Sequence, residues 1–216
     1  MELISAAISI IILVFSSILH EIAHGYVAYR LGDPTAKLLG RLTLDPRKHI
    51  DPYMSILLPI MLYIASGGRF IFGGAKPVPV DAFNLRDGRK DLALVSLVGP
   101  LTNLVLAILA SLIIHLIFPG EGFTSVFRSG TLGFILGSIV QWNLLLAIFN
   151  LVPIPPLDGS KVFALLLPPK QAAAFMSLGN MGMIILMLLL FFPIGGFSLM
   201  NVVYSLIVFS ISLLGL

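Results

Sequence analysis

The chain has 216 residues, of which 58% are hydrophobic and only 11% are charged, and its mean hydropathy is +1.05. Soluble domains carry about 25% charged residues, so this composition predicts a polytopic membrane protein and excludes an ordinary soluble enzyme. The net charge of +3 gives no reason to expect nucleic acid as a partner, and the absence of cysteine excludes disulfides and thiolate metal sites.

Five apolar segments are long enough to span a bilayer, because a spanning helix needs about 20 apolar residues. They are Leu3–Tyr29, Leu92–Phe118, Thr131–Leu151, Gln171–Phe192 and Phe197–Leu216. The start of the chain lacks the basic region of a cleaved signal sequence. We expect one membrane-embedded domain over residues 1–216, with a core at 3–159, a C-terminal helical pair at 171–216 and no attached regulatory domain.

The run Tyr53–Ala65 is shorter, contains Pro59, and is followed by the Gly- and Pro-rich stretch Gly73–Val80. Such a stretch, with alternating Val, is typical of a turn plus extended or edge-strand backbone. The run either spans as a sixth helix or dips into the bilayer and returns. The predicted fold is therefore an all-α polytopic membrane protein, a bundle of five to six transmembrane helices with a short re-entrant or β-hairpin insert after the first.

The distribution of basic residues favours the re-entrant arrangement, because cytoplasmic loops collect Lys and Arg. A sixth span would divide the 13 Lys and Arg residues into seven and six. A re-entrant Tyr53–Ala65 leaves Arg128 alone on one side and the other twelve together. This asymmetry predicts an external N-terminus and places the large loop and the C-terminus in the cytoplasm.

The first apolar segment contains His20-Glu21-Ile22-Ala23-His24. Two histidines four residues apart lie on one helical face, where both imidazoles can bind one metal ion, and the adjacent glutamate can reach a metal-bound water. Charged groups at membrane depth cost on the order of 2.5–3.5 kcal/mol each, which favours a function over a solvated helix end. The pattern predicts a metallohydrolase site.

A catalytic zinc usually has a third protein ligand, and Asp158 is the best candidate. It follows the break Pro153-Ile154-Pro155-Pro156, and broken backbone at membrane depth is tolerated where it lines a cavity. An Asp-Gly turn is the simpler alternative. His49 lies in a basic loop and His115 lies near a helix end, so we expect both outside the site. With Tyr53–Ala65 re-entrant, His24 and Asp158 lie toward the same face.

Three blocks together resemble the site-2 protease family of intramembrane metalloproteases, in its short form without PDZ or CBS domains. They are His20–His24, Gly99-Pro100-Leu101-Thr102-Asn103 and Asn150–Gly159. Gly73–Val80 also resembles the family's strand-forming insert. The resemblance implies one Zn²⁺ per chain on His20, His24 and Asp158. It also implies that Glu21 is the general base and that Asn150 binds the substrate backbone or the oxyanion. Asn103 is expected to pack the helices, although small and polar residues at that place could also line the site.

The function that follows is a zinc-dependent intramembrane endopeptidase in the plasma membrane of a prokaryote, with its active site toward the cytoplasm. Its partners would be transmembrane protein substrates and the lipid bilayer. We expect an extended substrate to pair with the Gly73–Val80 strand, or else that strand to be a plain hairpin. A metal transporter, a di-iron oxidase and an inactive structural protein are the rival readings. The lack of repeated halves argues against a transporter, and the small number of histidines argues against a di-iron oxidase. The complete ligand set argues against an inactive protein.

Overall fold

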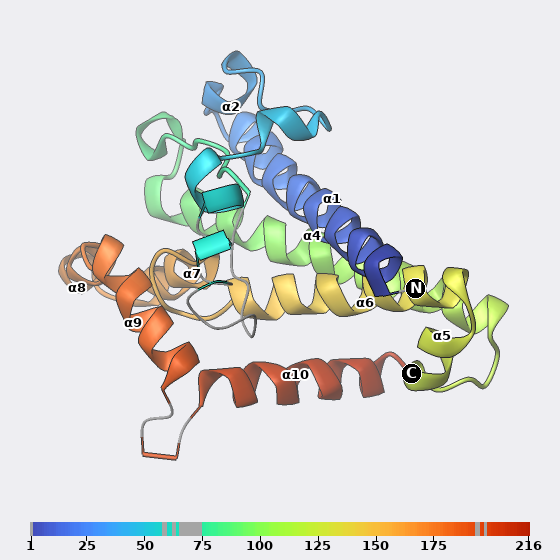
Figure 1. The fold of residues 1–216 in the computed structure, drawn as a ribbon. Helices are drawn as coiled ribbons and strands as arrows, with labels where there is room; N and C mark the ends of the chain where they lie inside the picture. The colour runs from blue at the N-terminus through green and yellow to red at the C-terminus, as the bar shows by residue number, and fades with distance from the viewer. Residues whose placement is uncertain (1, 58–59, 62–63, 65–74, 193–194, 197) are drawn as a thin grey trace.

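The computed structural model describes residues 2–57, 60–61, 64, 75–192, 195–196 and 198–216. The regular secondary structure of these residues is helical (Figure 1). Nine α-helices and three other short helices are described: α1 (Glu2–Arg30), α2 (Thr35–Leu38), η1 (Pro46–Lys48), η2 (Pro52–Leu57), η3 (Ala82–Asn84), α4 (Gly88–Ile117), α5 (Phe123–Arg128), α6 (Thr131–Asn150), α7 (Asp158–Leu166), α8 (Pro169–Met176), α9 (Gly179–Phe191) and α10 (Leu199–Leu213).

The first three predicted spans are confirmed as α1, α4 and α6, which are each long and apolar enough to cross a membrane. They pack through small residues, since Gly99, Ala107, Gly137 and Ala147 are buried between helices. In lipid, close approach at small residues holds helices together, and the large apolar side chains turn outward. Leu116, for example, is 82% exposed on the outside of α4.

The three spanning helices alternate in direction in a way that fixes the two ends of the bundle. His20 of α1 contacts Asn103 of α4 and His24 contacts Val95, so α1 and α4 are antiparallel. Asn143 of α6 contacts Ser16, and α6 then runs in the direction of α1 toward Asp158. Consequently the segment between α1 and α4 begins and ends at the same end of the bundle, as the re-entrant arrangement requires. Five of the 13 residues of Tyr53–Ala65 lie outside the described residues.

The predicted β-hairpin insert is not seen among the described residues. Gly73 and Gly74 lie outside them, and residues 75–80 have no regular secondary structure. Pro77 and Pro79 have no N–H to donate to a strand partner. Arg41 Nη2 donates to the carbonyl oxygens of Lys76 and Pro77 at 2.8 and 3.3 Å. These contacts engage the polar edge that a paired strand would use.

The C-terminal part of the structure differs from the prediction of two successive spanning helices. The predicted Gln171–Phe192 helix is divided into α8 and α9, which meet at a bend of more than 40°. Counting this bent pair as one span gives four candidate spans, and α10 is a shorter apolar helix. The break falls at Gly179, whose positive φ of 38° ends a helix readily.

The C-terminus lies at the end of the bundle away from the metal site, whereas the predicted topology places it at the same end as the site. α10 begins against Leu157, near the metal site, in a cluster with Leu199 and Val203. It ends at the opposite end of the bundle, where His115 Nε2 donates to the Leu214 carbonyl at 2.8 Å. Both chain ends therefore lie beside α5, away from the site (Figure 1). The sequence-based prediction differs because it counted the bent α8–α9 pair as a full crossing.

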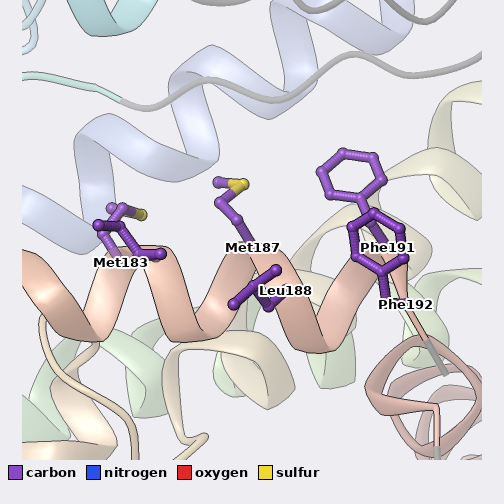
Figure 2. Close-up of a pocket in the computed structure, with 6 residues that line it drawn as sticks. Met183, Met187, Leu188, Phe191 and Phe192 are labelled. Carbon is purple, nitrogen blue, oxygen red and sulfur yellow. The ribbon is translucent and has the colours of Figure 1, made fainter. Parts of the chain in front are cut away.

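A shallow apolar hollow of about 230 Å³ follows α9 on the outside of this half (Figure 2). Met183, Met187, Leu188, Phe191 and Phe192 line it together with Ile184. Apolar surface of this kind suits lipid tails at membrane depth.

Candidate metal centre

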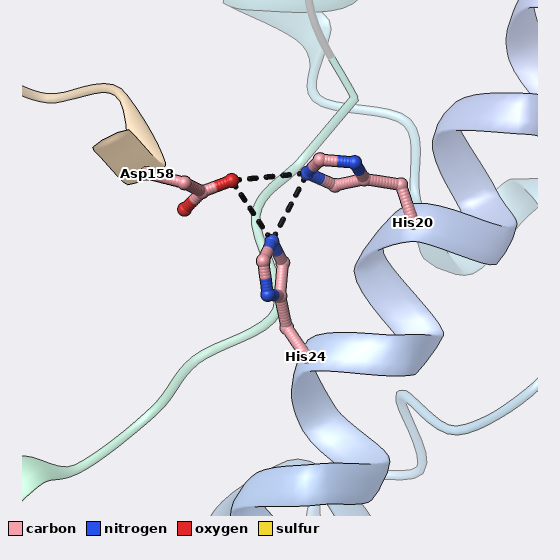
Figure 3. A group of neighbouring side chains, drawn as sticks. All are labelled: His20, His24 and Asp158. Atoms are coloured by element: carbon pink, nitrogen blue, oxygen red, sulfur yellow. Dashed lines mark hydrogen bonds and ion pairs between the residues drawn. The ribbon is translucent and has the colours of Figure 1, made fainter. Parts of the chain in front are cut away.

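The side chains of His20, His24 and Asp158 converge on one point between α1 and the start of α7 (Figure 3). The two imidazole Nε2 atoms are 3.0 Å apart. Asp158 Oδ2 lies 3.1 Å from Nε2 of His20 and 3.0 Å from Nε2 of His24. All three residues are buried or nearly so, with exposed fractions of 5%, 7% and 8%.

These separations are close to those of a metal-ligand set. Two ligands bonded at about 2.0–2.1 Å to a tetrahedral zinc lie about 3.3–3.4 Å apart. The three donor atoms at 3.0–3.1 Å would need to open by only a few tenths of an ångström. Two imidazole nitrogens and one carboxylate oxygen are a known donor set for a catalytic zinc, which keeps its fourth position for water or substrate.

The outer hydrogen bonds of the two histidines direct Nε2 of each neutral ring toward the centre of the cluster. His20 Nδ1 lies 2.6 Å from Asn103 Oδ1, and His24 Nδ1 lies 2.6 Å from the Val95 carbonyl oxygen. Both partners are acceptors, so Nδ1 of each ring carries the proton and Nε2 presents a lone pair. Two lone pairs and a carboxylate oxygen repel one another at 3 Å, and a metal ion or a proton held between them relieves that repulsion.

Gly99 of α4 leaves the space in which these rings meet. A Cβ at this position would lie 2.5 Å from Cε1 and Nε2 of His24 and 2.6 Å from Nε2 of His20. Only glycine, which has no side chain, lets α4 approach the two imidazoles this closely.

Asn103 belongs to a buried polar network that joins the three spanning helices. Its Oδ1 accepts from His20, and its Nδ2 donates to Asn143 Oδ1 at 2.8 Å. Asn143 Nδ2 in turn donates to Ser16 Oγ at 2.9 Å. Asn103 and Asn143 are both fully buried. The expectation that Asn103 packs the helices is therefore incomplete, because the same side chain orients a histidine of the cluster.

Glu21 points to the loop between α1 and α4. Its Oε2 accepts from the backbone N–H of Val78 at 2.7 Å, and Val78 is buried against Gly25. The residue adjacent to the metal cluster is thus held by a segment far away in the sequence. The sequence gives no signal for this contact, since it depends on how residues 75–81 return to α1.

Asp158 opens α7, where the broken backbone after α6 turns it toward α1. Burial alone would raise the pKa of this carboxyl, but hydrogen bonds from His20 and His24, when a proton is on Nε2, and the charge of Lys161 hold the pKa well below its usual range. Lys161 Nζ donates to Asp158 Oδ1 at 3.1 Å, so the two carboxylate oxygens face different partners. The carboxylate is therefore ionised, as a metal ligand must be.

The other polar residues singled out in the sequence lie away from this cluster. Asn150 Nδ2 donates to the Leu146 carbonyl of its own helix at 3.0 Å, and no contact between Asn150 and the cluster is seen in the described part of the chain. His49 Nε2 donates to the Thr43 carbonyl, and His115 contacts Leu214. Their expected positions outside the site match the structure.

A helical membrane bundle that carries a His-Glu-x-x-His helix and a convergent aspartate defines the class of membrane-embedded metallopeptidases. The profile of peptidase family M50 matches residues 8–131, more than half of the chain. The chain is 38% identical over 191 residues to the Bacillus subtilis protein named "Putative zinc metalloprotease YwhC", covering 88% of this chain and 83% of the relative.

Other relatives carry the same designation. Rip2 of Mycobacterium tuberculosis is 34% identical over 81% of this chain and 63% of its own length. MJ0611 of Methanocaldococcus jannaschii is 34% identical over 51% of each chain. No solved structure matches the chain. The chain belongs to peptidase family M50, the site-2 protease family of zinc metalloproteases.

Proposed function

We propose that the protein is a zinc-dependent intramembrane endopeptidase that hydrolyses peptide bonds in or near transmembrane segments of other membrane proteins. The observation that carries this proposal is the convergence of two lone-pair nitrogens and a carboxylate oxygen within 3.1 Å inside a membrane-spanning bundle. His20, His24 and Asp158 are the proposed ligands of one zinc ion. Zinc, when bound, supplies a Lewis acid that lowers the pKa of a coordinated water to about 7.

Glu21 is the proposed general base. It is adjacent to His20 on α1, and in this role its carboxylate takes a proton from the attacking water and returns it to the leaving amine. Oε2 is engaged by Val78, so Oε1 is the oxygen offered to the water. The Val78 contact orients the carboxylate, as a preorganised base requires.

Asn150 remains the proposed hydrogen-bond donor to the substrate backbone or the oxyanion. In the structure its amide is donated to Leu146, one turn earlier in α6. The proposed role therefore needs the side chain to rotate away from its own helix when substrate arrives.

The site is proposed to face the cytoplasm of a prokaryotic cell. Of the twelve Lys and Arg residues that the structure describes, eleven lie at the end of the bundle with the metal cluster, and Arg128 is alone at the other end. This asymmetry does not depend on the C-terminal helices, because no Lys or Arg follows Lys170.

Zinc content and cleavage, measured on the parent and on Glu21→Gln in detergent, test the proposal. A labelled single-span transmembrane peptide serves as substrate, and Glu121→Gln at the far end of the bundle is the matched control. We expect about one zinc per chain in all three proteins. We expect cleavage by the parent and the control, and a loss of at least a thousandfold in Glu21→Gln, which removes the base. Cleavage surviving in Glu21→Gln would contradict its role, and zinc-free parent protein would contradict the metal site.

A further inference from the structure

A second pocket, of about 430 Å³, lies on the loop between α1 and α4, away from the metal cluster. Four basic side chains line it, and two apolar residues complete much of its wall. They are Arg41, Arg47, Lys48 and Lys76, with Leu39 and Ile50. A pocket that combines positive charge with apolar walls suits an anionic amphiphile better than a free ion.

The positive charge of this pocket is poorly neutralised by the protein. Arg47 pairs with Asp45, but no ion pair of Arg41, Lys48 or Lys76 is seen within the described ranges. Residues 58–74, which precede Lys76, contain no Asp or Glu in their sequence. Like charges gathered in one place repel each other, and a bound anion relieves that repulsion.

Arg41 adds a buried donor that lacks an acceptor. Its side chain lines the pocket, and the residue is only 8% exposed. Nη2 is satisfied by the Lys76 and Pro77 carbonyls, yet the buried Nε has no hydrogen-bond partner among the residues described. Buried N–H groups without partners are rare and costly, and this one belongs to a charged side chain that lines the pocket.

The surroundings of the pocket are suited to the membrane surface. Leu38, Leu39 and Tyr53 are 78%, 60% and 71% exposed on the same loop, beside the basic side chains. Exposed apolar residues next to Lys and Arg at the end of a spanning helix are typical of the headgroup region, where the apolar groups enter the acyl boundary and the cations meet phosphates.

We propose that this pocket binds the phosphate group of an anionic phospholipid in the leaflet that faces the metal site. The phosphate oxygens accept from the ammonium groups of Lys48 and Lys76, beside the Arg41 side chain, and the acyl chains extend past Leu39. The bound headgroup also contacts the segment whose next residue, Val78, donates to Glu21. The bound lipid thereby stabilises the position of the loop that contacts the proposed general base.

The test measures binding and needs no cleavage assay, so it stands apart from the peptidase proposal. The full chain, purified in a neutral detergent, is titrated with dihexanoyl phosphatidylglycerol, with dihexanoyl phosphatidylcholine and with inorganic phosphate. Apparent affinity is read from the rise in unfolding temperature. We expect saturable stabilisation by phosphatidylglycerol only. The double variant Lys48→Gln/Lys76→Gln should bind about 30-fold more weakly, since each surface cation near an anionic lipid contributes about fivefold.

Lys170→Gln, which removes an exposed lysine of α8, is the matched control and should bind like the parent. Lys48 and Lys76 are exposed, so their replacement should leave the circular dichroism spectrum unchanged. Equal stabilisation by inorganic phosphate would overturn the lipid assignment, and equal stabilisation by phosphatidylcholine would overturn selection by charge. Parental affinity in the double variant, or an equal loss in Lys170→Gln, would overturn the location.

Discussion

Asn103 is neutral, yet it determines which nitrogen of His20 faces the metal cluster. Its Oδ1 accepts from Nδ1 at 2.6 Å, so Nε2 is left with the lone pair that a metal ligand requires. Replacing Asn103 by Ala should weaken zinc binding roughly 10- to 100-fold, the usual effect of losing an outer partner of a ligating histidine. Competition with a zinc chelator in detergent measures this affinity.

Asn143→Ala is the matched control for that variant. It removes a second fully buried asparagine from the same network but leaves the contact between Asn103 and His20 in place. We expect a comparable loss of thermal stability and a much smaller loss of zinc affinity. Equal losses of zinc affinity in the two variants would mean that Asn103 acts only through helix packing.

Gly99 supplies a second prediction, because its replacement by Ala should favour the helix and damage the site. Alanine is better than glycine in a helix by about 0.8–1 kcal/mol. The added methyl group, however, would lie 2.5 Å from the His24 ring, a distance that forces the imidazoles apart. Gly99→Ala should therefore lose zinc binding while circular dichroism shows undiminished helix content.

Gly122→Ala is the control for Gly99→Ala, since no described atom lies within 4 Å of a Cβ at that position. It should bind zinc like the parent. Zinc bound to Gly99→Ala with parental affinity would show that α4 can move away from α1 at little cost.

The candidate ligands could be predicted from the sequence, and their supports could not. His20 and His24 share a face because of the helical period alone, and Asp158 was found because prolines mark the broken backbone before it. Asn103 and Val78 reach the site from other elements, at separations of 83 and 57 residues from His20 and Glu21. Neither contact follows from a local pattern, since each depends on the register between packed elements.

At the level of elements, Asp33 joins the end of α1 to the loop that returns toward α4. Its carboxylate accepts from the Thr35 N–H and hydroxyl, from the Asp81 N–H at 2.7 Å and from Asn84 Nδ2. Burial by itself would raise the pKa of Asp33, but these donors lower the pKa below its ordinary value. The ionised form is therefore the one that stabilises the fold.

Asp33→Asn should lower the free energy of unfolding at pH 7 by about 1–3 kcal/mol, because an amide cannot accept all of these bonds. The pKa of Asp33 is lowered on folding, so its contribution is complete above the unfolded pKa of about 3.9 and is lost as the pH falls through the lower folded pKa. The difference in unfolding temperature between parent and variant should thus be constant from pH 6 to 8 and shrink below about pH 4.

Asp45→Asn is the matched control, because it makes the same chemical change in the exposed pair of Asp45 with Arg47. An exposed ion pair contributes about 0–1 kcal/mol, so this variant should unfold close to the parent at every pH. A difference between Asp33→Asn and the parent that persisted at pH 3 would contradict the ionic role of Asp33.

The long helices could be predicted from the sequence more reliably than the short ones. α1, α4 and α6 carry apolar runs of about 20 residues or more, and their existence followed from composition alone. The bend between α8 and α9 could not be predicted, because glycines in an apolar run are compatible with a straight helix. Where α10 ends depends on packing against α4 and α6, which hydropathy does not report.

At the scale of the whole molecule, the structure predicts that both chain ends lie on the side of the membrane opposite the metal site. The Leu214 carbonyl contacts Ser111 and His115 at the end of α4, beside the start of α6.

Cysteine labelling tests this arrangement. The chain has no cysteine, so single cysteines can be introduced without first removing others. Glu121→Cys and a cysteine appended after Leu216 should react with an impermeant maleimide on intact cells. Lys37→Cys and Lys170→Cys should react only after permeabilisation, because the basic end of the bundle faces the cytoplasm. An appended cysteine that needs permeabilisation, beside a freely reactive Glu121→Cys, would mean that α8 and α9 cross the membrane together and that α10 returns to the cytoplasm.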